Sequence, residues 1–276
     1  MRLKRSLKKI PYLMTVVALA RKVFFSERRI LSPGRSELLG RLGVMDPEAI
    51  PKVLEVLGRA HSSPSFVKIG ANDGLTGDPC GDIFLRDKRW RGLLVEPVDY
   101  CVDKLKNTYS DSARFTICQV AIGHKQERRK FFFMAKEAKY SFPGMPEWYD
   151  QLGSFDREHV AKHFSAEADK FIIEKEIDVC PLSLILKRTG FVAPLVLHID
   201  VEGFDYEVLK SLNFRQSCPS VIMAEHKHLS ASDLYFMTEL LDGKGYLILN
   251  TGGDILALSR TAAKALDATL GIRLPD

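Results

Sequence analysis

Apolar and polar positions change their spacing in a regular order along the chain after Pro47. Short apolar runs bounded by glycine, proline or polar residues predict buried strands, and apolar residues three and four positions apart predict amphipathic helices. Strands are predicted at residues 65–70, 92–96, 114–122, 195–200, 220–225, 246–250 and 254–259. Helices are predicted at residues 48–60, 100–109, 206–212 and 232–244.

The order of these elements predicts a fold of the α/β, Rossmann-like class. Strands that alternate with helices form a mostly parallel sheet, here seven-stranded, with helices on both faces. The last two strands are joined by the turn residues Thr251, Gly252 and Gly253, so we expect a C-terminal hairpin that adds an antiparallel edge.

Residues 131–180 interrupt the pattern with aromatic and polar sequence. An insertion of this length beside an α/β sheet is typical of a lid or an acceptor pocket. Phe155, His159 and His163 have helical spacing, which predicts a helix with one face turned toward the acceptor. Trp148 either stacks against a sugar ring or fills the core of the lid itself.

Composition indicates a soluble protein with one sizeable domain, since 46% of the 276 residues are hydrophobic and 27% are charged. The net charge of +5 comes largely from basic residues in the first thirty positions, so the rest lacks the broad basic face of a nucleic-acid binder. The five cysteines show no paired or metal-ligand spacing, which favours reduced thiols in the cytoplasm.

Residues 1–46 are predicted to be a basic amphipathic N-terminal extension, and residues 47–276 the folded domain. The apolar run at residues 10–20 is too short to cross a bilayer, and its helical periodicity argues against a secretory signal. Residues 1–25 fit either a helix lying on the inner membrane face or a helix packed on the domain or on a second subunit. The sequence leaves these alternatives, and the oligomeric state, open.

A glycine turn follows the first predicted strand, at Gly70 to Gly74. Ligands of open α/β sheets bind at the carboxyl ends of the strands, where such a turn lets the backbone approach them. The spacing is not the GxGxxG pattern of dinucleotide sites, which makes an oxidoreductase a poor match. Glu96 ends the next strand, where an acid for ribose hydroxyls is expected. A close turn with a ribose acid and no phosphate loop suits S-adenosylmethionine, although a glycine turn alone is also a common structural feature.

Several motifs in order carry a resemblance to a known family. They are Phe66-Val67-Lys68-Ile69-Gly70-Ala71-Asn72-Asp73-Gly74, Asp78-Pro79, Trp90-Arg91-Gly92-Leu93-Leu94-Val95-Glu96-Pro97, His198-Ile199-Asp200-Val201-Glu202-Gly203-Phe204-Asp205-Tyr206 and Glu225-His226. Over residues 65–260 the chain resembles the FkbM family of S-adenosylmethionine-dependent methyltransferases. The segment Leu152-Gly153-Ser154-Phe155, with His159 and His163, resembles a branch of that family. Lys68 and His198 depart from it, since many members carry an acid and a lysine there.

The resemblance implies a class I methyltransferase fold and O-methylation of a hydroxyl on a saccharide or similar natural product. The cofactor-binding candidates are Gly70, Ala71, Asn72, Asp73, Gly74, Glu96, Pro97, Gln119, Val120, Ala121 and Asp200. The substrate-binding candidates are Trp148, Ser154, His159 and His163.

Acids and histidines gather at the ends of two later strands. Methyl transfer to oxygen requires alignment of the two reacting atoms and a base for the hydroxyl proton. The catalytic candidates are His198, Asp200, Glu202, Glu225 and His226. The acids at 200 and 202 also suit the start of the helix that follows them, and a lone strand histidine is often a core residue.

Asp200 and Glu225 are also candidates for a divalent metal such as magnesium, which prefers oxygen ligands. The competing function is a catalytically silent methyltransferase-like module that binds a partner. Acids and histidines at adjacent strand ends favour catalysis over that alternative.

Overall fold

The computed structural model describes residues 33–270. The segment expected to contact a membrane or a subunit, residues 1–25, lies outside this range. Within it, residues 35–44 form a short helix and a strand that join the main sheet, so this part of the expected extension belongs to the folded domain. None of the helices described over residues 33–270 is both long and apolar enough to cross a membrane.

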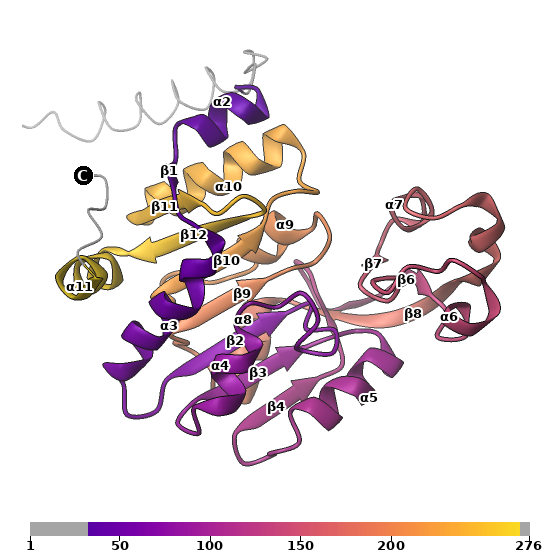
Figure 1. Ribbon diagram of the computed structural model, residues 1–276, viewed down its shortest axis with the longest axis horizontal. Coiled ribbons are helices and arrows are strands. Elements are labelled where there is room, and N and C mark those ends of the chain that lie inside the picture. Colours follow the sequence, from indigo (N-terminus) through magenta and orange to yellow (C-terminus); the bar gives the residue numbers. More distant parts are fainter. Residues whose placement is uncertain (1–32, 271–276) are drawn as a thin grey trace, which may run out of the picture.

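A large twisted sheet forms the centre of the molecule (Figure 1). Its eight strands within the described range follow the order β1 (Gly43–Val44), β11 (Tyr246–Asn250), β12 (Asp254–Ser259), β10 (Val221–Glu225), β9 (Val196–Ile199), β2 (Ser65–Ile69), β3 (Arg91–Val95) and β4 (Phe115–Cys118). Only β12 runs antiparallel to its neighbours. The order reverses between β2 and β9, so the carboxyl ends of these two strands flank a crevice where ligands of such sheets bind.

The predicted Rossmann-like fold is confirmed, with differences at its edge. β12 lies between β10 and β11, and β1 adds one more parallel strand beyond β11. The C-terminal hairpin is therefore not the edge of the sheet, as the sequence pattern predicted. Two residues of strand are too short to give a periodic signal, which is why β1 escaped prediction.

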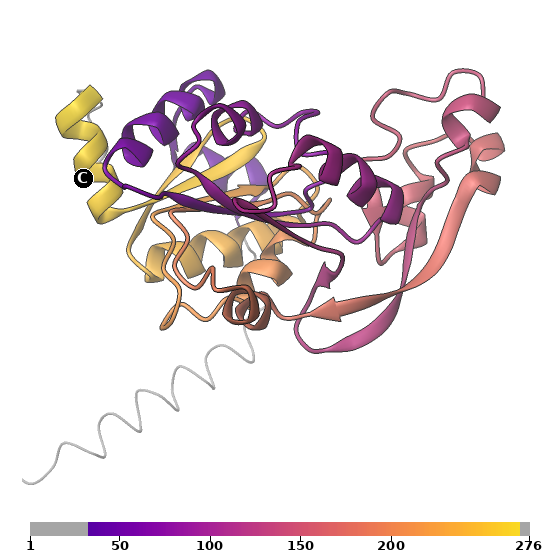
Figure 2. The same ribbon diagram turned by 90° about the horizontal axis from the view of Figure 1, so that it is seen from below.

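Helices cover both faces of the large sheet, which Figure 2 shows from the side. The helices on one face are α3 (Ile50–Arg59), α4 (Gly81–Arg86), α5 (Asp99–Thr108) and α11 (Arg260–Leu270), and a short 3-10 turn, η1 (Pro47–Ala49), precedes α3. The helices on the other face are α2 (Arg35–Gly40), α8 (Leu182–Thr189), α9 (Asp205–Lys210) and α10 (Ala231–Gly243). Each face has its own core, because side chains alternate between the two sides of every strand.

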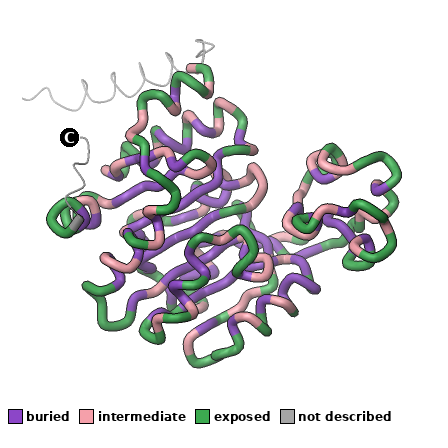
Figure 3. The backbone as a smooth tube through the Cα atoms, viewed as in Figure 1, coloured by how far each residue is buried: buried purple, intermediate pink, exposed green. Residues whose placement is uncertain are grey.

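The insertion forms an arm that projects from the sheet, at the right of Figure 1. Its elements are β5 (Ala121–Ile122), β6 (Glu127–Met134), α6 (Ala138–Ser141), β7 (Gly153–Ser154), α7 (Arg157–Ala161), η2 (Ala166–Phe171) and β8 (Ile172–Cys180). The strands pair in the order β5-β8-β6-β7, and a long antiparallel ribbon of β6 and β8 is the backbone of the arm. Figure 3 shows buried positions inside the arm, where Met134, Tyr149 and Val160 belong to a small core.

The third predicted strand, residues 114–122, is divided in the structure. β4 ends at Cys118 in the large sheet, and β5 begins at Ala121 in the arm, where it pairs with β8. The chain thus changes sheets at Gln119 and Val120. A continuous apolar run cannot reveal such a change, because both halves are strands.

Candidate functional site

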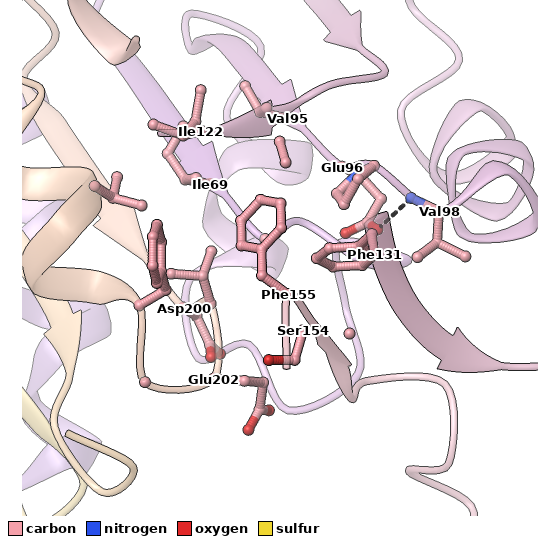
Figure 4. A pocket seen from close by; sticks show the side chains of 18 of the residues that line it. Ile69, Val95, Glu96, Val98, Ile122, Phe131, Ser154, Phe155, Asp200 and Glu202 are labelled. Atoms are coloured by element: carbon pink, nitrogen blue, oxygen red, sulfur yellow. Dashed lines mark hydrogen bonds between the residues drawn. The ribbon is translucent and has the colours of Figure 1, made fainter. Parts of the chain in front are cut away.

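One cavity of about 260 Å³ lies where the strand ends of the large sheet meet the base of the arm (Figure 4). Its lining combines an apolar wall with a small number of polar groups, a composition typical of ligand sites. The apolar wall includes Ile69, Val95, Val120, Ile122, Phe131 and Phe155. The polar groups include Glu96, Asp150, Ser154, His159, Asp200, Glu202 and His228.

Glu96 is fixed at one end of this cavity. Its Oε1 accepts a hydrogen bond from the Val98 amide at 2.9 Å, and its Oε2 accepts one from the Asn72 amide at 2.9 Å. Burial raises the pKa of Glu96 to about 7, and the two amide hydrogen bonds partly offset that rise. Each carboxylate oxygen keeps a second lone pair, so Glu96 can still accept hydrogen bonds from a ligand.

The glycine turn brings the backbone of β2 against the loop after β9. Gly70 has a φ of +74°, and a Cβ there would lie 1.8 Å from the Asp200 carbonyl oxygen. No other residue fits this approach, because both the positive φ and the contact exclude a side chain. Gly70 therefore closes one wall of the cavity with backbone alone.

The rest of the turn supports the cavity from behind. Asn72 has a φ of +46°, and its side chain donates to the Asp150 carbonyl oxygen of the insertion at 2.8 Å. Asp73 accepts from the amides of Leu75 and Thr76. Among the cofactor-binding candidates, Gly70, Glu96, Pro97, Val120, Ala121 and Asp200 line the cavity, whereas Ala71, Asn72, Asp73, Gly74 and Gln119 do not.

Asp200 and Glu202 form the opposite end of the cavity, in the loop after β9. Asp200 is exposed to the cavity that it lines, but protein atoms surround its carboxylate on the other sides. Loss of hydration there, together with the nearby Glu202 carboxylate, raises the pKa of Asp200 to about 6. Glu202 has a φ of +55°, an uncommon conformation for a residue with a side chain. Strained backbone of this kind is concentrated at functional sites.

His198 lies away from this cavity. It stands beside Lys68 in the sheet register, on the face that carries Phe66 and Met223. Its Nδ1 lies 3.8 Å from Asp78 Oδ1, and Lys68 Nζ is 2.6 Å from Asp78 Oδ2. Burial and the Lys68 charge lower the pKa of His198 to about 4.

The sequence placed His198 and Asp200 on one strand face, and the structure separates them. β9 ends at Ile199, so Asp200 belongs to the loop and no longer follows the alternation of the strand. His198 and Lys68, the two positions that depart from the resembled family, lie in one buried group.

The acids and histidines at the end of β10 also lie in different surroundings. Glu225 Oε1 lies 3.9 Å from His228 Nε2, beside the cavity wall, and burial raises the pKa of Glu225 to about 8. His226 points elsewhere: its ring lies 2.7 Å from the Arg35 guanidinium and 3.3 Å from Asn250 Oδ1. Asp200 and Glu225 do not come together in any ligand group of the described residues, although each stands near Glu202.

The substrate-binding candidates of the insertion occupy different places. Ser154 and His159 line the cavity. His163 lies behind His159, with ring centroids 5.3 Å apart. Trp148 lies outside the cavity, 41% exposed, and packs against Phe164 with centroids 5.6 Å apart.

Some lining residues carried no signal in the sequence. Phe131 and Asp150 reach the cavity because the arm folds back over α5, where Lys104 forms an ion pair with Asp150. Asp205 does not line the cavity but is fully buried behind it, and it accepts a hydrogen bond from the Glu225 amide at 3.2 Å, which ties the start of α9 to the end of β10. These contacts depend on tertiary structure. In the sequence, only the polar residues near each strand end could have indicated that such contacts form there.

The residues present fit a nucleoside that carries no phosphate. Ile69, Val95 and Ile122 offer an apolar surface for a flat base, and Glu96 offers acceptors for ribose hydroxyls. Gly70 leaves room for backbone contact with the remainder of the ligand. The strand order and the site at its reversal point define a methyltransferase-like α/β protein of class I.

Comparison with known proteins places the chain within this class. The model of the Methyltransferase FkbM domain family matches residues 68–248, and the chain belongs to that family. The family is one of methyltransferases, and membership in it supports S-adenosylmethionine as the methyl donor. No curated protein matches the sequence.

Similar solved structures are distant in sequence. Methyltransferase FkbM from Methylobacillus flagellatus is 16% identical with a TM-score of 0.47, and the match covers 88% of this chain and 60% of that one. The O-methyltransferase from Bacillus cereus in complex with SAH is 9% identical with a TM-score of 0.40, covering 92% and 93% of the two chains. Precorrin-6y C5,15-methyltransferase from Geobacter metallireducens is 9% identical with a TM-score of 0.36, covering 80% and 95%.

Proposed function

We propose that the chain transfers a methyl group from S-adenosylmethionine to a hydroxyl oxygen of a saccharide or similar natural product. The observation that carries this proposal is that one cavity has a ribose-type acid at one end and a second acid at the other. Glu96 and Asp200 both line it, and the arm adds Ser154 and His159 to the lining.

Residues at the ends of β2 and β3 bind the donor. Glu96 accepts hydrogen bonds from the ribose hydroxyls with the lone pairs that Asn72 and Val98 leave free. Pro97 borders this end of the cavity, Gly70 lies between it and the loop after β9, and the apolar wall excludes water around the base. When bound, S-adenosylmethionine supplies an electrophilic methyl group, whose bond to sulfur breaks as the acceptor oxygen bonds to carbon.

The loop after β9, together with residues of the arm, binds the acceptor and takes up its proton. Asp200 lines the cavity beside Gly70, so a hydroxyl that approaches the donor end lies next to its carboxylate. Asp200 accepts the hydroxyl proton as the oxygen bonds to carbon. Glu202, Ser154 and His159 hold the acceptor in line, which supplies the orientation that a displacement reaction needs.

The experiment is a methyl-transfer assay with a labelled methyl donor and a panel of saccharides and hydroxylated metabolites, followed by mass spectrometry of the products. Calorimetric titrations with S-adenosylmethionine, its demethylated product and NAD run in parallel. We expect donor binding and label in an O-methyl ether. Label on nitrogen or carbon would contradict O-methylation. Donor binding with no transfer to any member of the panel would favour a silent binding module, and binding of NAD alone would exclude a methyltransferase.

A further inference from the structure

Three histidines and two acids converge where the arm meets the loops after β9 and β10. His159 and His163 come from α7 and the turn after it, four residues apart on one helical face. His228 follows β10, and Glu202 follows β9. Glu225 ends β10 beside them.

The backbone of the two loops explains how Glu202 and His228 meet. Gly203 has a φ of +92°, and a Cβ there would lie 2.9 Å from the His228 carbonyl oxygen. The loop after β9 thus packs directly on the loop after β10. This approach brings Glu202 Oε2 within 3.3 Å of His228 Nε2 and within 3.9 Å of His159 Nε2.

The three imidazoles surround a common point. One ligand atom from each of His159, His163 and His228 lies within 4.8 Å of the others, and so do atoms of Glu202, Glu225 and His228. The ring centroids are 5.3 Å apart for His159 and His163, and 5.6 Å apart for each of these with His228. Nitrogen ligands at about 2.0–2.1 Å from a zinc ion put imidazole centroids at tetrahedral angles roughly 5 Å apart.

Four polar atoms of this group lack a hydrogen bond within residues 33–270, although Lys162 Nζ lies 3.2 Å from the other ring nitrogen of His159. His159 Nε2, His163 Nε2, Glu202 Oε2 and Glu225 Oε2 are buried without a hydrogen bond to the described residues. Leaving one buried polar atom unsatisfied costs about 1–3 kcal/mol. These atoms belong to two overlapping groups that share His228, which indicates a ligand bound between them.

We propose that His159, His163, His228 and Glu202 bind one divalent transition-metal ion, with Glu225 held beside them. Imidazole nitrogens suit zinc, iron, nickel or cobalt, whereas magnesium prefers oxygen ligands. The two histidines four residues apart on a helical turn have the spacing of helical zinc ligands. This ligand set differs from the Asp200 and Glu225 pair suggested by the sequence.

The metal site would also define the class of acceptor, an inference that rests on the proposed function. His159, His228 and Glu202 line the cavity that we assign to donor and acceptor. His159, His228 and Glu202 would hold the ion beside the acceptor, where it would supply Lewis-acid chemistry that makes a nearby hydroxyl easier to deprotonate, and Asp200 would accept the proton. The acceptor class is therefore one with a hydroxyl that can coordinate a metal, such as a sugar diol.

The test uses the full chain without a polyhistidine tag, stripped of metal by a chelator and titrated with Zn²⁺ by calorimetry in the absence of donor. Co²⁺ is added in a parallel experiment, because its visible absorption reports nitrogen-rich coordination. His163→Ala is the main variant, since His163 does not line the cavity. His61→Ala, at an exposed histidine after α3, is the matched control, and circular dichroism checks that both variants fold.

We expect one Zn²⁺ per chain and a Co²⁺ spectrum in the wild-type protein and in His61→Ala. Loss of an outer partner of a metal ligand costs roughly 10–100-fold in affinity, so loss of the ligand in His163→Ala should cost at least about 100-fold. No stoichiometric Zn²⁺ binding, or equal binding in His163→Ala and His61→Ala, overturns the metal site. Glu202→Gln gives a second test if His163→Ala unfolds, with the same expected loss.

The readout is separate from the proposed activity. Metal binding that depends on His163, in a protein that binds no S-adenosylmethionine, would leave the metal site standing and overturn the proposed function. Methyl transfer by a protein that binds no Zn²⁺ or Co²⁺ would do the reverse.

Discussion

Two groups of acids and histidines flank the end of β9, and they differ in how their charges are balanced. In the first, Asp78 Oδ2 forms an ion pair with Lys68 Nζ at 2.6 Å, and Asp78 Oδ1 lies 3.8 Å from His198 Nδ1. In the second, no lysine among residues 33–270 comes that close to Glu202 or Glu225: Lys227 Nζ lies 3.9 Å from Glu225 Oε1, and Lys162 Nζ lies 3.2 Å from His159 Nδ1. Among the described residues, the first group leaves one buried atom, His198 Nδ1, without a hydrogen bond, whereas the second leaves His159 Nε2, His163 Nε2, Glu202 Oε2 and Glu225 Oε2. We infer that the ion pair of the first group supports the structure and that the larger set of unpartnered atoms in the second marks a place that binds a ligand.

The comparison also explains why similar residue types have different roles. The first group lies under α4, on the face that holds Phe66 and Met223, and it does not line the cavity. The second stands at the carboxyl ends of the strands, where loops rather than strands set the positions of side chains. Location at the strand end, and not residue type, separates the site from the core.

The largest effect is expected from removing the lysine of the first group. Lys68→Met leaves Asp78 buried without its main partner, and breaking a buried ion pair costs about 3–5 kcal/mol. Denaturant unfolding should show a loss of this size in the free energy of unfolding. The double variant with Asp78→Asn should recover part of it, and a loss below about 1 kcal/mol would mean that this group is not structural.

The second prediction concerns the base in the cavity. Asp200→Asn removes the group that takes the hydroxyl proton, and loss of general base catalysis lowers rates by about 100-fold or more. Transfer from labelled donor is measured at saturating concentrations, while calorimetry should show donor affinity within a few-fold of wild type. Asp267→Asn, at an exposed position of α11, serves as the control, and equal rates in the two variants would remove Asp200 from the mechanism.

The third prediction concerns the donor end. Glu96→Ala removes the acceptors for the ribose hydroxyls, and hydrogen bonds to a charged group contribute about 1.5–3 kcal/mol. The dissociation constant for S-adenosylmethionine should therefore rise by roughly 10–100-fold. Glu55→Ala on α3 should leave it unchanged. Unaltered affinity in Glu96→Ala would place the donor elsewhere.

The smallest effect is a pH dependence of donor affinity. Glu96 has a pKa of about 7 in the protein without ligand, and only the ionised carboxylate accepts hydrogen bonds at both oxygens. The affinity for S-adenosylmethionine is therefore highest above pH 7 and falls as the pH drops through that value. Well below it, the loss approaches about tenfold per pH unit. Titrations between pH 8 and pH 5.5, in roughly half-unit steps, measure the slope, and Glu96→Gln should flatten it. A slope that persists in Glu96→Gln would assign the proton to another group.

Much of the sheet could be predicted from the sequence because its strands are short apolar runs that end at glycine, proline or acid. β2, β3, β9 and β10 lie within one or two residues of the predicted strands. The arm could not be predicted in detail, because β6 and β8 carry charged residues on their exposed face and pair across a long insertion. Their pairing depends on tertiary contacts rather than on a local apolar period.

The site was predicted unevenly for a similar reason. Gly70 and Glu96 followed from position, since each lies at the end of a parallel strand. His198 was grouped with Asp200 by strand alternation, which does not extend past Ile199. The convergence of His163 with His228 joins segments that are distant in sequence, and no local pattern reports such a contact.

We propose that one cavity holds the methyl donor against Glu96, with Asp200 at its other end. A crystal structure of the chain with S-adenosylhomocysteine tests it most directly. We predict the ribose hydroxyls within hydrogen-bond distance of the Glu96 carboxylate and the sulfur facing the side of the cavity that Asp200 lines. A ligand bound outside this cavity, or a ribose that makes no contact with Glu96, would contradict it.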